Sequence, residues 1–393
     1  MNDIRKINLK NKNVLIRTDF NVPLNQGVLI DNFRIKEALP TINYCLSKGA
    51  SITLMSHLGR PNGEIVQSLS LDPIAFALEE LLDKEVMFSN DCISEDAISL
   101  SSQLLPGEIH LLENLRFYKE EMSNDNEFAR KLAQHGDIFI NDAFGTSHRT
   151  HASNVGVAKL IKNNCMGLLV EKELKYLDFT LKNPESPFTV ILGGAKVHDK
   201  IPFIDNMLKK ADSILIGGAM AFTFLKAIDK NIGSSLIDEN SISFAKNIIE
   251  NAKDNNTEII LPVDVVSSHK LSDNSTWRIS SLDDLKDTES GYDIGPETSM
   301  NFQMIISKAK TIIWNGPLGV SEIPEFSTGT QAVASAVMDQ TKEGATSIIG
   351  GGDTASALNQ YGLKEGFSHT STGGGASLHL LSGNTLPAIE VLN

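Results

Sequence analysis

Hydrophobic and polar positions divide the chain into short, continuously apolar runs separated by longer amphipathic stretches. The apolar runs are rich in β-branched residues, a pattern typical of strands in parallel sheets that are covered on both faces. In the first half of the chain this pattern predicts strands at 13–20, 50–57, 108–114 and 136–144. In the second half it predicts strands at 187–194, 213–218, 258–266, 311–316 and 346–351.

The stretches between the strands have the periodicity of helices, for example at 34–49 and 328–344. Strands alternating with helices indicate an α/β fold, and 393 residues exceed what one ordinary core accommodates. We therefore predict two doubly wound, Rossmann-like domains with parallel sheets. A further helix is expected at 167–183, and it is either a stiff connector between the domains or a surface helix of the first domain.

The composition narrows the classes of function. Hydrophobic residues make up 41% and charged residues 21%, as in soluble globular proteins, and no apolar run approaches the ~20 residues of a membrane helix. The formal charge of −14 argues against nucleic acid or a membrane surface as partner. Three isolated cysteines (Cys45, Cys92 and Cys165) fit reduced thiols in a cytoplasmic protein.

Arginine is distributed unevenly, because seven of the eight arginines precede residue 150. An arginine accompanies each predicted strand end of the first half, in RTDFN (17–21), SHLGRP (56–61), ENLRF (113–117) and NDAFGTSHR (141–149). Ligands of open α/β sheets bind at the carboxyl ends of the strands, and guanidinium groups suit phosphate and carboxylate. Although a single such arginine is ordinarily just a solvated charge, four together predict a site for a small anionic molecule.

Glycine dominates the strand ends of the second half, in GGAK (193–196), GGAM (217–220), NGPLG (315–319), GGGDT (350–354) and TGGGA (372–376). These ends predict close backbone approach to phosphates and a flat base. No GxxxxGK[ST] motif occurs, so the site is not the common NTPase loop. The G-x-G-x-x-A spacing from Gly350 to Ala355 is also found in dinucleotide-binding sites, so a nicotinamide dehydrogenase is an alternative interpretation. Such a site also needs an acidic residue at the end of a second strand about 20 residues later, and none is present.

Ten motifs, in order over nearly the whole chain, resemble the phosphoglycerate kinase family. They are RTDFNVPL (17–24), DNFRI (31–35), SHLGRP (56–61), ENLRF (113–117), NDAFGTSHRTHAS (141–153), GGAKVHDKI (193–201), YDIGPET (292–298), WNGPLGV (314–320), IGGGDT (349–354) and SHTSTGGGAS (368–377). The resemblance implies reversible, Mg²⁺-dependent phosphoryl transfer between 1,3-bisphosphoglycerate and ADP, giving 3-phosphoglycerate and ATP, by a cytoplasmic, monomeric enzyme of glycolysis and gluconeogenesis.

The resemblance also implies a domain plan, with two domains facing each other across a cleft and joined by a helix. Residues 1–168 would bind phosphoglycerate and 169–374 the nucleotide, with 169–186 as connecting helix and hinge. Residues 375–393 would return to the first domain. Transfer would be direct and in line, after hinge closure.

Site residues follow from the resemblance position by position. Those expected to bind phosphoglycerate are Asp19, Phe20, Asn21, Arg34, His57, Leu58, Gly59, Arg60, Arg116 and Arg149. Those expected to bind the nucleotide are Lys200, Gly291, Glu322, Gly351, Gly352, Asp353 and Thr354, with Asp353 as the metal ligand. Those expected to act in the transfer itself are Arg34, Lys196, Lys200, Gly373 and Gly374, because this reaction needs positive charge around the transferred oxygens.

Three residues depart from the family's usual pattern: Thr18, Ser321 and His379. Ser321 bears on how its neighbour Glu322 is positioned, and His379 on how the last helix packs. A non-catalytic binding protein with the same fold is the rival interpretation. Such a protein would tolerate the loss of Arg34 or Lys196, yet both are present.

Overall fold

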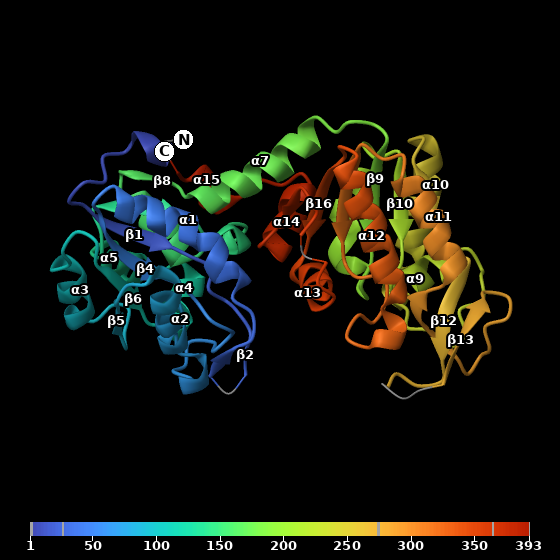
Figure 1. Ribbon diagram of the computed structural model, residues 1–393, viewed down its shortest axis with the longest axis horizontal. Coiled ribbons are helices and arrows are strands. Elements are labelled where there is room, and N and C mark those ends of the chain that lie inside the picture. The colour runs from blue at the N-terminus through green and yellow to red at the C-terminus, as the bar shows by residue number, and fades with distance from the viewer. Residues whose placement is uncertain (1–2, 26, 273–275, 364, 393) are drawn as a thin grey trace. The chain divides into compact units, whose positions relative to one another are not determined.

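The computed structural model describes residues 3–25, 27–272, 276–363 and 365–392. Contacts divide the chain into two compact units, Met1–Lys175 with Thr385–Asn393 and Tyr176–Asn384. Each unit contains its own six-stranded parallel sheet surrounded by helices (Figure 1). The prediction of two parallel-sheet α/β domains is therefore confirmed, whereas the assignment of a ligand to each range of residues stays a prediction.

The sheet of the first unit has the order β5-β6-β4-β1-β7-β8. Its strands are β1 (Asn13–Arg17), β4 (Ser51–Met55), β5 (Val86–Ser89), β6 (Ile109–Leu112), β7 (Ile138–Asn141) and β8 (Asn164–Met166). In the central strand β1, Leu15 pairs with Thr53 on one side and with Phe139 on the other. All residues of β4, β6 and β7 are buried, as expected for strands with helices on both faces.

Helices of the first unit follow its strands. They are α1 (Phe33–Ser47), α2 (Asp72–Leu82), α3 (Glu95–Ser102), α4 (Lys119–Ser123), α5 (Asn126–Ala133), α6 (Val157–Leu160) and α15 (Pro387–Glu390), with a π-helix, η5 (Ala152–Gly156), before α6. Local capping explains where some begin: the side chain of Asp125 accepts from the Phe128 amide at 2.9 Å at the start of α5. A short hairpin of β2 (Leu24–Asn25) and β3 (Val28–Leu29) precedes α1.

The second unit has a sheet of order β11-β10-β9-β15-β16-β17. Its strands are β9 (Phe188–Leu192), β10 (Ser213–Ile216), β11 (Glu258–Ile260), β15 (Thr311–Asn315), β16 (Thr346–Gly350) and β17 (His369–Thr370). Its helices are α8 (Ile201–Met207), α9 (Met220–Ala227), α10 (Ile242–Asp254), α11 (Pro296–Ile306), α12 (Thr328–Lys342), α13 (Gly352–Gln360) and α14 (Gly374–Leu381). Buried Trp314 and Ile349 belong to the core that this sheet shares with α11 and α12.

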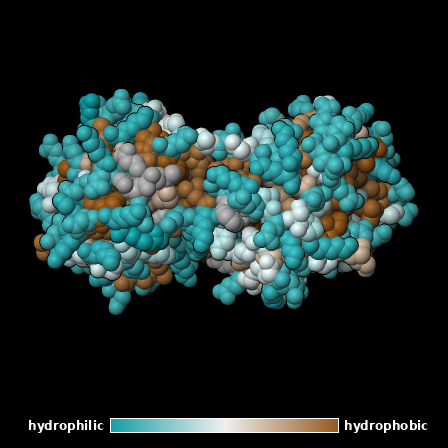
Figure 2. Space-filling view, turned by 90° about the horizontal axis from the view of Figure 1, so that it is seen from above, coloured by the Kyte–Doolittle hydropathy of each residue, from teal (hydrophilic) through white to brown (hydrophobic). Residues whose placement is uncertain are grey.

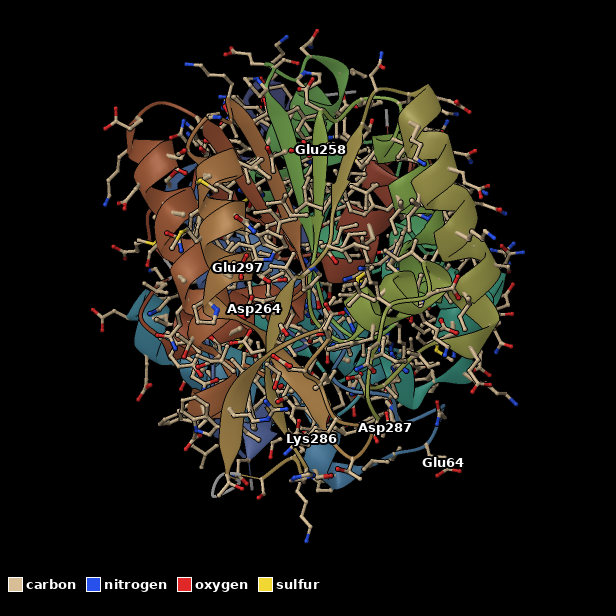
Figure 3. All side chains as sticks on the ribbon, turned by 90° about the vertical axis from the view of Figure 1, so that its right-hand side faces the viewer. Glu64, Glu258, Asp264, Lys286, Asp287 and Glu297 are labelled. Atoms are coloured by element: carbon tan, nitrogen blue, oxygen red, sulfur yellow. The ribbon has the colours of Figure 1, made fainter. Side chains whose placement is uncertain are left out.

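One predicted strand, 258–266, is wrong as a single element. Pro262 interrupts it, since proline has no N–H for a central ladder. The chain forms β11 and then β12 (Asp264–Ser268), which joins β13 (Trp277–Ser281) and β14 (Ser290–Ile294) in a separate antiparallel sheet. Asp264, near Glu297 in Figure 3, accepts from the Glu297 amide at 3.0 Å and so caps α11.

The helix α7 (Leu168–Lys182) is shared between the units. At its first turn the buried carboxylate of Asp142 accepts from the Leu169 amide at 3.0 Å, within the first unit. Just past the middle of α7, the ring of Tyr176 stacks on His369 of the second unit, with the ring centroids 4.8 Å apart. The chain later returns, because Thr385–Asn393 groups with the first unit, while α14 groups with the second.

Hydrophilic side chains cover most of the surface visible in Figure 2. Among the residues that the structure describes, no helix has the length and apolar character needed to span a membrane.

Candidate functional site

The strand-end arginines of the first unit meet at one edge of its sheet, because β6, β4, β1 and β7 are neighbours and run parallel. Arg34, the second residue of α1, reaches the same edge. Its Nη1 donates to the Asn21 carbonyl at 3.0 Å and to Asp19 Oδ2 at 3.3 Å. The structure therefore brings together residues from the β1 loop and α1 that the sequence assigned to a single site.

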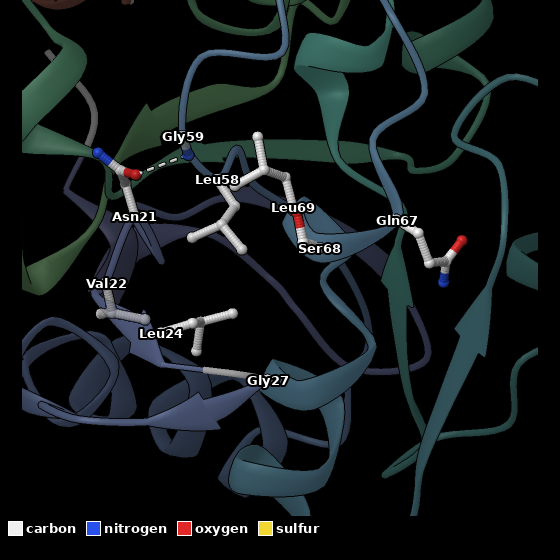
Figure 4. A pocket seen from close by; sticks show the side chains of 9 residues that line it. All are labelled: Asn21, Val22, Leu24, Gly27, Leu58, Gly59, Gln67, Ser68 and Leu69. Atoms are coloured by element: carbon white, nitrogen blue, oxygen red, sulfur yellow. Dashed lines mark hydrogen bonds between the residues drawn. The ribbon is translucent and has the colours of Figure 1, made fainter.

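Asn21 connects the β1 loop to the β4 loop. Its Oδ1 accepts from the Gly59 amide at 2.9 Å, the bond drawn as a dashed line in Figure 4. Beside this bond lies a pocket of about 580 Å³, whose lining includes Leu58 and Leu69. Phe20 is fully buried, and its amide donates to Ser56 Oγ at 2.8 Å. Phe20 therefore belongs to the core under the β1 loop and Leu58 lines the pocket, while the hydrogen bond from Gly59 to Asn21 connects the two loops.

Arg116 follows β6 and is 5% exposed. Its Nη1 donates to the Gly59 carbonyl at 2.6 Å, whereas its buried Nε has no hydrogen-bond partner among the described residues. Burial lowers the pKa of Arg116 to about 10, and the charges of Arg17 and Arg149 act in the same direction. A buried donor without a partner, beside other cations, is what an anionic ligand would satisfy.

The remaining predicted residues of this edge differ in exposure. Arg60 is exposed and Arg149 half-buried, with Arg149 Nε donating to His148 Nε2 at 3.2 Å. His57 is 2% exposed, and burial holds its pKa well below the usual 6.5, with Arg17 adding to the effect. A neutral imidazole at this edge can donate one hydrogen bond without adding charge.

Arg17 was recognised only as part of the RTDFN motif and was not assigned to the site. It is the last residue of β1 and is completely buried, in contact with His57, Ser153 and the buried carboxylate of Glu121. Neither Glu121 nor Ser153 was assigned to the site from the sequence. Glu121 belongs to none of the motifs, and Ser153 ends the motif 141–153 without a signal in the sequence that it is buried.

In the second unit, several strand-end glycines are explained by packing against each other. A Cβ on Gly193 would lie 2.0 Å from the Pro317 carbonyl oxygen, and one on Gly316 would lie 2.3 Å from the Gly193 oxygen. Gly218 has φ +62°, and its Cβ would lie 2.6 Å from the Gly194 amide. Packing of the backbone by itself therefore explains why Gly193, Gly218 and Gly316 are glycines, whereas the expectation of close approach to phosphates at these strand ends stays a prediction.

The other glycines form an open edge where two helices begin. Gly351, with φ +97°, precedes α13, and Gly373 precedes α14. The two starts touch, because a Cβ on Gly374 would lie 3.3 Å from the Gly352 amide nitrogen. A Cβ on Gly352 would meet nothing within 4 Å. Two converging helix N-termini present backbone amides and positive dipole ends, which suit phosphate groups.

Buried Thr354 and Asn315 lie next to the glycines of this edge. The buried Thr354 Oγ1 accepts from the Gly316 amide at 2.7 Å and donates to the Gly350 carbonyl at 3.0 Å. Buried Asn315 Nδ2 has no partner among the described residues, and a Cβ on Gly351 would lie 3.1 Å from it. Asn315 was read only as part of the NGPLG strand end and was not predicted as a site residue.

The two lysines that follow Gly194 lie differently. Lys196 is exposed, whereas Lys200 is 8% exposed and its ammonium donates to the carbonyls of Gly193 and, at 3.1 Å, Asn315. Burial lowers the pKa of Lys200 to about 8, and the charge of Asp353 opposes this shift. The structure therefore holds Lys200 against backbone oxygens and leaves Lys196 free to meet a ligand.

The other two residues expected at the nucleotide, Glu322 and Gly291, lie in the loop after β15 and in β14. Glu322 is exposed, beside buried Ser321, whose carbonyl accepts from the Tyr361 hydroxyl. Gly291, in β14, lies against Phe222, since its Cβ would be 2.3 Å from that ring. The serine at 321 is therefore accommodated by burial, and the backbone next to Glu322 is held by Tyr361.

Comparisons with known proteins support these motifs over the whole chain. A family model described as phosphoglycerate kinase matches residues 4–384. A relative named phosphoglycerate kinase from Thermosipho africanus is 52% identical over 98% of this chain and 96% of its own length. One from Prosthecochloris aestuarii is 49% identical over 98% of both chains.

The chain belongs to the phosphoglycerate kinase family.

Solved structures agree with this assignment. The structure of phosphoglycerate kinase from Coxiella burnetii has a TM-score of 0.86 and 40% identity, covering 99% of this chain and 97% of that one. The predicted family, the α/β fold and the class of phosphotransferase are thus confirmed. Membership of the phosphoglycerate kinase family also decides against the nicotinamide dehydrogenase considered from the G-x-G-x-x-A spacing.

A phosphoglycerate kinase uses ATP and ADP. In the described part of the chain, no three His, Cys, Asp or Glu side chains group as a metal site would require. Asp353 is exposed in the first turn of α13, directly after open Gly352. One carboxylate together with nucleotide phosphates is a usual way of holding Mg²⁺, so these residues fit a metal that arrives with the nucleotide.

Proposed function

We propose that the protein catalyses reversible phosphoryl transfer between 1,3-bisphosphoglycerate and Mg-ADP, giving 3-phosphoglycerate and Mg-ATP. The observation that carries this is a division of chemistry between the units. Buried guanidinium groups gather at one sheet edge of the first unit, and two helix N-termini with a lysine gather at one sheet edge of the second. The first suits a small, highly charged acid and the second a chain of phosphates.

On the acid side, the residues divide by the part of the ligand that each would bind. Arg60, Arg116 and Arg149 would bind the phosphate that is not transferred, because they follow separate strands of one sheet and Arg116 Nε has no hydrogen-bond partner in the described part of the chain. Asp19 and Asn21 would orient the acid, since both also hold Arg34 in place. His57 would donate to an oxygen of the acid from its neutral ring.

On the nucleotide side, the amides at Gly351, Gly352 and Gly374 would meet the phosphates, and Asp353 would hold the magnesium ion. The metal would supply positive charge that offsets the phosphate oxygens. Thr354 would keep the Gly350–Gly352 turn in shape through its two backbone bonds. Gly291 and Glu322 would lie toward the nucleoside.

The transfer step needs position and charge. The attacking oxygen is already an anion, a carboxylate in one direction and a phosphate in the other, so no general base is required. Arg34 and Lys196 would stabilise the charge on the transferring group, with the helix starts at Gly373 and Gly374. Lys200 would move from its backbone acceptors to the nucleotide phosphates when these are bound.

Because the two ligands are assigned to different units, the units must bring the reacting atoms to about 3–3.5 Å before transfer. We place the hinge at 169–186, where Asp142 holds the first turn of α7 and Tyr176, just past the middle of the helix, stacks on His369. A closed form would gain contacts to both ligands only when both are bound. We further propose a cytoplasmic location, consistent with three free, buried cysteines, and a monomeric state, which only the family resemblance suggests.

The test is a coupled assay of ATP-dependent phosphorylation of 3-phosphoglycerate. Turnover should require both substrates and Mg²⁺. Arg34→Ala should lower kcat by about 10²-fold or more while ATP still binds, because a charge aimed at the transition state is lost. Arg130→Ala, at an exposed arginine paired with Glu127, is the matched control and should keep full activity. Absence of turnover in the wild-type protein, or equal effects of both substitutions, would contradict the proposal.

A further inference from the structure

Glu121 is a carboxylate enclosed within the first unit, directly behind the acid site. It lies on α4, is 0% exposed, and belongs to no motif that assigned a site residue. Burying a carboxylate is costly unless it is paired and hydrogen-bonded. Its partners therefore indicate what the charge is for.

Ser153, in the π-helix η5, is the first partner of Glu121. Its hydroxyl donates to Glu121 Oε1 at 2.6 Å and its amide to Oε2 at 2.9 Å. The hydroxyl has one proton, so toward Arg17 it acts as an acceptor, and Arg17 Nε donates to it at 2.7 Å. The direction of donation is thus determined from Arg17 through Ser153 to Glu121.

Arg17 continues this chain toward the site. Its Nη1 donates to the Thr18 carbonyl, and its Nη2 lies 4.0 Å from Glu121 Oε1 and 3.2 Å from His57 Nδ1. A guanidinium donates and never accepts, so His57 Nδ1 must be the acceptor. In a neutral imidazole the single proton then sits on Nε2.

We infer that Glu121 is a positioning residue, which through Ser153 and Arg17 fixes His57 as the neutral tautomer that offers Nε2–H to an oxygen of the acid. This inference deepens the proposed function and rests on its assignment of the acid to this edge of the sheet. Glu121 has the right charge for the task, because Arg17 is fully enclosed and Glu121 and Asp19 are the carboxylates that oppose its burial. Asp19 also contacts Arg34, whereas Glu121 lies behind Arg17 with Ser153 and His151.

The cations around His57 favour the neutral ring, since Arg17, Arg116 and Arg34 all disfavour a second charge there. The Asp19 carboxylate, whose Oδ1 lies 3.9 Å from His57 Nδ1, acts in the opposite direction, but burial and the three arginines outweigh it. His151 Nδ1 is 3.6 Å from Glu121 Oε1, and burial lowers the pKa of His151 to about 3, so it adds no cation near neutral pH. His57 therefore stays neutral, and Arg17 decides which nitrogen carries the proton.

The decisive measurement is the tautomer of His57 by ¹⁵N NMR of protein labelled at histidine, with the signal assigned by its loss in His57→Gln. Wild-type protein at neutral pH should show a protonated Nε2 and an unprotonated Nδ1. In Glu121→Gln, the amide group of the new side chain would donate toward Ser153 and displace the Arg17 donor from its position. The ¹⁵N signals of His57 should then no longer show a single tautomer.

Kinetics provide the second measurement. Glu121→Gln should raise KM for 3-phosphoglycerate by about tenfold or more, the effect of a weakened charge-assisted hydrogen bond, while KM for ATP changes less than about twofold. Ser153→Ala, which breaks the chain but keeps the carboxylate, should shift both the NMR signature and KM in the same direction. Glu120→Gln, on the same helix and half-buried, is the matched control and should change neither.

The outcomes are separable. A wild-type His57 that is charged at neutral pH or protonated on Nδ1 would overturn the inference, whether or not any variant folds. So would a folded Glu121→Gln protein with unchanged tautomer and unchanged KM. If the wild-type protein had the expected tautomer but no activity on 3-phosphoglycerate, the chain of contacts would stand and the proposed function would fail.

Discussion

Acidification should destabilise the first unit through two buried histidines, His110 and His135. Ser101 Oγ lies between them, 2.8 Å from His110 Nδ1 and 2.6 Å from His135 Nδ1. The outer nitrogens contact Ser89 Oγ at 2.8 Å and the Cys92 carbonyl at 3.0 Å. Hydroxyls and a carbonyl satisfy neutral rings but provide no counter-charge, so protonating either ring is costly.

The size of the effect follows from the shifted titration. Burial lowers the pKa of each histidine from 6.5 to about 4, and for His110 the neighbouring His135 adds to the shift. Because the unfolded chain binds protons first, the contribution is fully present above pH ~6.5 and is lost as the pH falls toward ~4. Between about pH 7.5 and pH 5.0 the loss is about 2 kcal/mol per histidine, on the order of 4 kcal/mol for both.

Hydrogen exchange is the suitable assay. Both tryptophans, Trp277 and Trp314, lie in the second unit, so intrinsic tryptophan fluorescence would not report unfolding of the first. Exchange of peptides from β6 and α5, measured in increasing urea at both pH values, gives the free energy of unfolding where the histidines lie. The perturbation is the double substitution His110→Gln with His135→Gln, and the control is His198→Gln, at an exposed histidine of the second unit.

At the higher pH the double variant should have a lower free energy of unfolding than the wild-type protein, because buried hydrogen bonds are lost. Its free energy of unfolding should, however, depend less on pH. Between the two pH values, the decrease in its free energy of unfolding should be smaller than that of the wild-type protein by about 4 kcal/mol. The control should lose as much as the wild-type protein. Equal pH dependence of the double variant and the wild-type protein would refute the reasoning.

Three further predictions concern the nucleotide edge. Lys196→Ala should lower kcat by about 10²-fold with ADP affinity unchanged in a titration, and weak ADP binding with normal saturated turnover would refute a role in transfer alone. Since burial lowers the pKa of Lys200 to about 8, kcat/KM for the nucleotide should fall above about that pH as the free enzyme loses this charge, and a flat pH profile would exclude the role. Gly352→Ala should leave the melting temperature unchanged, because its Cβ meets nothing within 4 Å, yet weaken ATP binding; unchanged affinity would place the phosphates elsewhere.

Much of the fold was predictable because continuous apolar strands in a parallel sheet have one physical explanation. The predicted strands 13–20 and 311–316 correspond to β1 and β15, and helix 328–344 to α12. Short edge strands such as β8 and β17 were missed, since three and two residues carry no periodicity. The break at Pro262 was visible in the sequence but was outweighed by the apolar residues around it.

The chain by itself determined the family, the two sheets and the residues at the strand ends, because motif order and local hydrophobic pattern do not depend on distant contacts. Only the tertiary structure decided which charges are enclosed. Arg17, Glu121 and Ser153 are far apart in the sequence and become one hydrogen-bonded chain when β1, α4 and η5 pack together. Likewise, Gly193 and Gly352 both lie in glycine-rich strand ends, yet backbone atoms occupy the space where a Cβ of Gly193 would lie, whereas the space beside Gly352 is open. Burial and proximity are properties of the packed chain, and they decide which polar residues can serve a site.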